Sequence, residues 1–130
     1  MVEDHSGIRA GLEVCLESEG HEVRLFCSCA AAWEAWSSGL DAELVLLDLG
    51  TPGPISATEL VSRIERLSPG QGRVAPQFCL MSGNPNLQEM ADDMNLPLRL
   101  QKPFTLSELG PILSARSSAS YSALPQISAL

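Results

Sequence analysis

Hydrophobic positions along the chain form two kinds of pattern. Continuous apolar runs stand at residues 44–47 and 78–81, and a run without polar alternation is typical of a parallel strand buried on both faces. Elsewhere the apolar positions have helical spacing, most clearly at Ile8, Leu12 and Leu16. The pattern predicts strands at 22–26, 43–48, 78–81 and 98–100, and helices at about 6–20, 30–37, 56–67, 84–94 and 105–113.

Local signals support these helix ends. Ser56 with Glu59, and Thr105 with Glu108, are spaced as capping boxes, in which the hydroxyl caps the helix and the Glu side chain reaches back. Residues 68–72 are predicted to form a turn because they contain Pro and two Gly. Pro111 lies inside the last helix, where we expect a kink because proline removes one backbone hydrogen bond.

Strand and helix alternate, which predicts an α/β fold with one parallel sheet, right-handed crossovers and helices on both faces. A chain of 130 residues suits a single domain, which we expect to span residues 1–114. Residues 115–130 are rich in Ser and Ala with little periodicity, so a disordered tail or linker is predicted there.

Composition narrows the class of partner. The net charge is −8, with only eight Lys and Arg, so direct nucleic-acid binding is not expected. The apolar runs are too short to cross a bilayer, so no membrane association is expected. The four cysteines lack metal-ligand spacing and are expected to be reduced, as in a cytoplasmic protein.

Polar side chains follow the predicted strands, and the carboxyl ends of parallel strands are where ligands bind in open α/β sheets. Glu3 and Asp4 come near the start of the chain. Asp48 ends the predicted strand 43–48, Ser82 follows the strand 78–81, and Lys102 follows the strand 98–100. Asp48 taken alone is equally well explained as a residue that caps the following loop.

Several carboxylates at one edge repel each other unless a cation is present, and oxygen ligands suit Mg²⁺. With Mg²⁺ bound, Asp48 could act as a nucleophile toward a phosphoryl group. Lys102 would balance charge on the phosphoryl oxygens, and Ser82 would donate a hydrogen bond to one of them.

Four segments in this order and spacing resemble the receiver domain of two-component response regulators. They are Glu3-Asp4, residues 48–53, Met81-Ser82-Gly83 and Lys102-Pro103-Phe104. The resemblance covers roughly residues 2–114. It implies a flavodoxin-like (CheY-like) doubly wound five-stranded sheet of order 2-1-3-4-5.

The resemblance also implies the roles of the site residues. Asp48 would accept a phosphoryl group from a histidine kinase or phosphotransfer protein. Mg²⁺ would be held by Asp4, Asp48 and the Gly50 carbonyl, with Glu3 acting mostly through bound water. Ser82, Gly83 and Lys102 would contact the phosphoryl group, and the Lys102–Pro103 bond would be cis.

The sequence departs from the family pattern at three places. One affects loop shape more than chemistry: Ser56 stands where the family has glycine, and one residue is inserted before the helix. Only Val2 remains of the apolar first strand, which is central in the family, so the chain is either cut or destabilised there. Arg99 replaces the aromatic residue that usually couples the phosphoryl site to the partner-binding face, and an arginine does not bury itself in the same way.

Three functions follow as hypotheses. The first is a phosphorylatable receiver in a phosphorelay. We do not expect it to be an enzyme, and both a monomer and a homodimer are compatible with it. The second is a degenerate receiver that binds a partner without phosphorylation, as the short first strand and Arg99 suggest. The third, a small hydrolase with Asp48 as nucleophile, lacks a lid that would exclude water.

Overall fold

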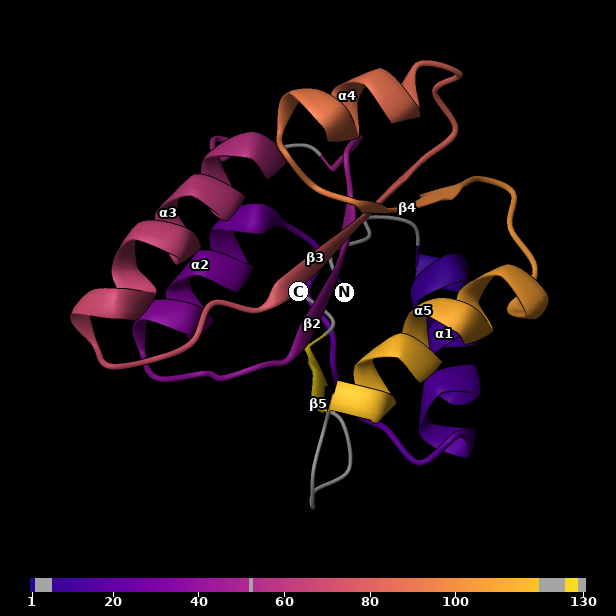
Figure 1. The fold of residues 1–130 in the computed structure, drawn as a ribbon, viewed down its shortest axis with the longest axis horizontal. Helices are drawn as coiled ribbons and strands as arrows, with labels where there is room; N and C mark the ends of the chain where they lie inside the picture. The colour runs from indigo at the N-terminus through magenta and orange to yellow at the C-terminus, as the bar shows by residue number, and fades with distance from the viewer. Residues whose placement is uncertain (2–5, 52, 120–125, 129–130) are drawn as a thin grey trace.

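The computed structural model describes residues 1, 6–51, 53–119 and 126–128, which form a five-stranded sheet covered by helices (Figure 1). The strands are β1 (Glu22–Arg24), β2 (Leu44–Asp48), β3 (Gln77–Ser82), β4 (Leu98–Gln101) and β5 (Gln126–Ser128). The helices are α1 (Ser6–Ser18), α2 (Cys29–Ser37), α3 (Ala57–Gly70), α4 (Leu87–Asp93) and α5 (Leu106–Ala119). Within the described part of the chain, no helix is both long and apolar enough to span a membrane.

The strands lie in the order β1-β5-β2-β3-β4, and every pairing between neighbours is parallel. The α/β class and the parallel sheet predicted from the hydrophobic pattern are confirmed. The four strands predicted from that pattern occupy the expected positions, with β1 and β4 at the two edges.

The central position differs from the expectation. The predicted order placed the short N-terminal strand between β1 and β2, whereas the structure places the C-terminal strand β5 there. Met1 bonds to the chain at the carboxyl end of β1. Its amino group donates to the Arg24 carbonyl (3.3 Å), and its carbonyl accepts from the Phe26 amide (3.3 Å). Residues 115–130 were expected to be a disordered tail or linker. Of these, residues 115–119 continue α5 and residues 126–128 form β5, which pairs on both sides, whereas 120–125 and 129–130 lie outside the described residues.

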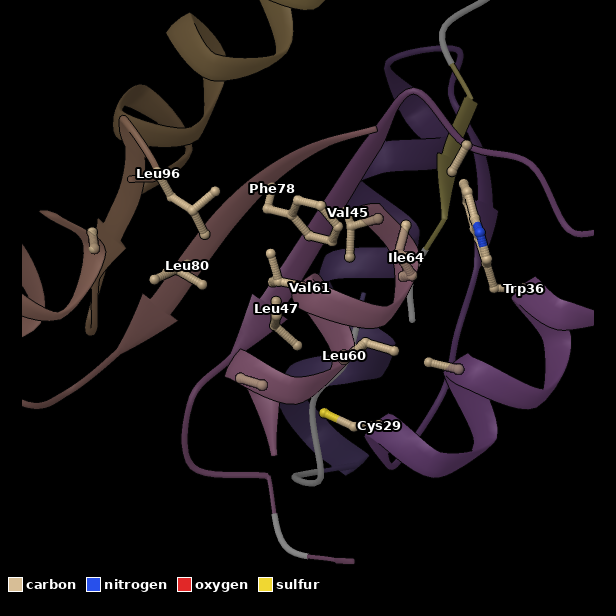
Figure 2. Close-up of a cluster of buried hydrophobic side chains, with 14 of the residues drawn as sticks. Cys29, Trp36, Val45, Leu47, Leu60, Val61, Ile64, Phe78, Leu80 and Leu96 are labelled. Atoms are coloured by element: carbon tan, nitrogen blue, oxygen red, sulfur yellow. The ribbon is translucent and has the colours of Figure 1, made fainter. Parts of the chain in front are cut away.

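Two hydrophobic clusters sandwich the sheet, because successive residues of a strand point to opposite faces. Val45 and Leu47 of β2, with Phe78 and Leu80 of β3, pack under α2, α3 and α4 (Figure 2). The alternate positions of these strands pack against α1 and α5, and include Leu44, Leu46, Cys79 and Met81. The whole of β2 is buried, as its continuous apolar run predicts.

Helix ends differ in detail from the capping signals. Ser56 caps α3 by accepting a hydrogen bond from the Glu59 amide (3.1 Å). The Glu59 side chain does not complete the capping box: it pairs with Arg63 one turn later (2.8 Å). The predicted turn at 68–72 begins later, because α3 continues through Pro69 to Gly70.

Removing buried volume from α3 tests this packing. Ile64 is 0% exposed in the cluster beneath α3, so Ile64→Ala should lower the free energy of unfolding by about 2–5 kcal/mol. Val74 is 87% exposed, so Val74→Ala should change it by less than about 0.5 kcal/mol. Urea unfolding measures both, and equal effects would contradict the described core.

Candidate functional site

Asp48 ends β2 at the carboxyl edge of the sheet, and it is only 6% exposed. The loop that follows folds back on it: the Gly50 amide donates to Asp48 Oδ1 (3.3 Å), and the Thr51 hydroxyl donates to the Asp48 carbonyl (3.0 Å). The Leu49 amide also donates to the Met81 carbonyl of β3 (3.0 Å). These bonds fix where β2 stops and hold the carboxylate at the sheet edge.

Lys102 follows β4 at the same edge, and its Nζ lies 3.4 Å from Asp48 Oδ1. Its backbone amide donates to the Ser82 carbonyl at the end of β3 (2.8 Å), so the segment after β4 is tied to the neighbouring strand. The Lys102–Pro103 peptide bond is cis, as the resemblance implied. Lys102 is the only lysine in the chain.

Ser82 ends β3 between these two strands and is buried. Its Oγ accepts a hydrogen bond from the Asn84 amide (3.0 Å), which is the turn-capping role that a serine takes after a strand. Gln101, which the sequence analysis did not single out, donates from Nε2 to the carbonyls of Ser82 and Asn84 (3.1 Å each). Gln101 therefore fixes the β3–α4 loop against β4.

The remaining predicted site residues lie in different surroundings. Gly83 is exposed, and a Cβ atom added there would meet no atom within 4 Å, so the space above it is open. Arg99 is exposed on the edge strand β4 and pairs with Leu80 in the ladder. Glu3 and Asp4 lie outside the described residues, so their predicted place beside Asp48 stays a prediction.

Cys29 is a neighbour of the site that sequence reasoning missed. It begins α2 and is buried. Burial, and secondarily the negative charge of Asp48, raise the pKa of its thiol to about 11. No local sequence signal links residues 29 and 48, because only the fold brings the start of α2 to the end of β2.

Two of the predicted Mg²⁺ ligands lie in the described part of the chain, and both present oxygen atoms. They are the Asp48 carboxylate and the Gly50 carbonyl, and hard oxygen ligands are those that Mg²⁺ favours. The other two predicted ligands, Glu3 and Asp4, belong to the part of the chain that is not described. Among the described residues, no three His, Cys, Asp or Glu side chains gather closely enough to hold a metal ion by themselves.

Neither a model of a known protein family nor a curated protein sequence matches the chain. Solved structures do match it. A response regulator receiver domain protein from Clostridium thermocellum has a TM-score of 0.74 at 19% identity, with 91% of each chain covered. A CheY-like receiver domain protein from Methanospirillum hungatei JF-1 has a TM-score of 0.70 at 20% identity, covering 92% of this chain and 94% of that one.

A third match is RcsB from Salmonella enterica serovar Typhimurium, bound to promoter rprA in the presence of the phosphomimetic BeF3⁻. It has a TM-score of 0.68 at 19% identity, covering 90% of this chain and 58% of RcsB. The chain therefore has the fold of response regulator receiver domains, and the flavodoxin-like fold predicted from the resemblance is confirmed.

Thiol reactivity tests the charge at this site. Asp48→Asn removes the negative charge that repels the Cys29 thiolate, so the pKa of Cys29 should fall and its alkylation at pH 8 should accelerate. Cys79, whose pKa is raised to about 12 by burial alone, serves as the matched buried control and should not change. Peptide mass spectrometry measures both rates, and equal acceleration of both thiols would show loosening of the fold instead.

Proposed function

We propose that the protein is a phosphoacceptor receiver in two-component signalling, in which Asp48 takes a phosphoryl group from a histidine kinase or phosphotransfer protein. The observation that carries the proposal is the pairing of Asp48 with Lys102 at 3.4 Å, at the carboxyl edge of a receiver-domain fold. An ammonium beside the acceptor carboxylate is the arrangement that phosphoryl transfer needs, since it offsets charge on the incoming phosphoryl oxygens.

The transfer proceeds by attack of an Asp48 carboxylate oxygen on the phosphorus of a phosphohistidine. The new O–P bond forms as the N–P bond breaks, and the bonding pair returns to the imidazole nitrogen of the donor. Lys102 stays beside the carboxylate and pairs with a phosphoryl oxygen. The Ser82 hydroxyl, already at this edge, donates to another phosphoryl oxygen after the loop beyond β3 adjusts.

In this proposal Mg²⁺ is held by Asp48 and the Gly50 carbonyl together with Glu3 and Asp4. When bound, the ion supplies the positive charge that two or more acidic side chains and a phosphoryl group together require. This role requires no chemistry on any substrate besides the phosphodonor, so we propose a signalling module and not an enzyme.

Access for a donor protein is available beside Lys102. An apolar hollow of about 470 Å³ lies between the start of α1 and the segment after β4, and it is lined by Gly7, Gly11, Leu12, Lys102, Pro103 and Phe104. A partner that inserts apolar side chains there would bring a phosphohistidine close to the Asp48–Lys102 pair. The charge of −8 adds no reason to propose direct contact with nucleic acid or a membrane.

A second candidate is a receiver fold that binds its partner without phosphorylation, and the exposure of Arg99 favours it. An exposed arginine on β4 does not offer the buried-to-exposed ring movement that couples phosphorylation to partner binding in the family. In the lead proposal, phosphorylation shifts the conformation around α4 and β4 by another route.

A small phosphodonor separates the two candidates. With acetyl phosphate and Mg²⁺, the protein should gain one phosphoryl group by intact-mass analysis, and Asp48→Asn should abolish the gain because it removes the nucleophile. Asp92→Asn, an exposed position on α4, is the matched control and should be modified at the wild-type rate. Removal of Mg²⁺ with a chelator should stop incorporation.

Two results would reject the phosphoacceptor role. One is incorporation that persists in Asp48→Asn, which would place the group on another residue. The other is no incorporation into a folded wild-type protein together with no Mg²⁺ binding by calorimetry at millimolar concentration. The second result would favour the binding module that works without phosphorylation.

A further inference from the structure

The centre of the sheet is a slot between β1 and β2 that β5 fills. Gln126, Ile127 and Ser128 pair with Glu22–Arg24 on one side. On the other side, Ile127 and Ser128 pair with Leu44 and Val45. Figure 1 shows β5 beside the lower part of β2, far in sequence from both of its neighbours. The C-terminal strand is therefore a central element of the sheet.

An empty slot between β1 and β2 would be energetically costly. In the described part of the chain, β5 is the only strand that pairs with β1, and it is also the strand through which β1 reaches β2. Leu44 is fully buried. The backbone of Glu43 and Leu49 bonds to the β3 side, so Leu44, at an alternate position, directs its backbone groups toward β5, and loss of β5 would leave those groups without partners. Each such buried group costs about 1–3 kcal/mol. A released β5 is therefore replaced by another strand instead of leaving an open gap.

The strand is also short. It holds three residues, and residues 120–125 connect it to the end of α5. A second copy of the chain offers the same three residues in the same register, so the exchanged contacts are chemically identical to the original ones. Domain swapping has a low energetic cost for this reason.

We propose that β5 is an exchangeable strand, which enters the β1–β2 slot of a second copy and forms a reciprocal dimer. The partner is another molecule of this chain, because its residues 126–128 reproduce both registers with the same side chains. The fraction of dimer rises with protein concentration, since exchange replaces intramolecular pairing by intermolecular pairing. This proposal is independent of the phosphoacceptor role.

Disulfide trapping tests the exchange. Arg24 and Ser128 are register partners, and neighbouring strands lie about 4.8 Å apart, within disulfide reach. Two chains are prepared in a Cys27→Ser background, which removes the exposed native thiol. One carries Arg24→Cys and the other Ser128→Cys. They are mixed, refolded together from urea at high concentration and oxidised.

The matched control replaces Ser128→Cys by Gln126→Cys, which shifts the thiol by two residues and sets its Cα about 8 Å from that of Arg24, beyond disulfide reach. Strand exchange predicts a disulfide-linked heterodimer from the Arg24→Cys and Ser128→Cys chains at a yield roughly tenfold above the control. The yield should fall when refolding is carried out at low concentration.

A single chain carrying both Arg24→Cys and Ser128→Cys supplies the second measurement. If it forms an intramolecular disulfide while the mixed chains give no more heterodimer than the control, β5 is seated only in its own chain and exchange is overturned. If neither experiment gives a disulfide above the control, β5 does not occupy the slot in this register, and exchange is overturned as well.

Discussion

The shared register of β2, β3 and β4 is the constraint on which the candidate site depends. Asp48 pairs with Met81, and Ser82 pairs with Gln101, the last residue of β4. The residue that follows Gln101 is Lys102, whose ammonium reaches the Asp48 carboxylate. A slip of one residue would turn every side chain of a strand to the opposite face. Burial of both faces of β2 opposes such a slip, because it would exchange the two hydrophobic clusters.

The hydrophobic core and the site are therefore two consequences of one pattern. The apolar residues of β2 and β3 set the register, and the polar residues immediately beyond them have to meet at the edge. Backbone bonds then complete the arrangement, as when the Lys102 amide binds the Ser82 carbonyl and Gln101 ties down the neighbouring loop. The central slot supports the same sheet from the other side of β2, where β5 pairs with Leu44 and Val45.

Much of this arrangement could be predicted from the sequence, because the relevant signals are local. Continuous apolar runs identified β2 and β3, and their carboxyl ends identified Asp48 and Ser82 before any contact was known. Lys102 was identified in the same way beyond β4. The fourth predicted strand, β4, was found from only three residues because Lys102-Pro103 marks its end.

The features that escaped prediction depend on contacts between distant residues. β5 has no strand signal in its Ser- and Ala-rich surroundings, and it becomes a strand only through pairing with β1 and β2. Glu59 matched a capping box but pairs with Arg63, since both bonds are open to a first-turn glutamate on an exposed helix face. The positions of Glu3 and Asp4 beside Asp48 stay a prediction.

The central claim is that Asp48 and Lys102 hold one phosphoryl group between them, and acetylation of Lys102 tests it most directly. Lys102 is the only lysine, so peptide mass spectrometry follows its modification by an acetylating reagent without interference from other side-chain amines. With Mg²⁺ and beryllofluoride, a phosphoryl mimic, the rate should fall roughly tenfold or more, because charge-assisted contacts hold the ammonium. In Asp48→Asn it should not fall. An unchanged rate in the wild-type protein, or an equal fall in the variant, would contradict the claim.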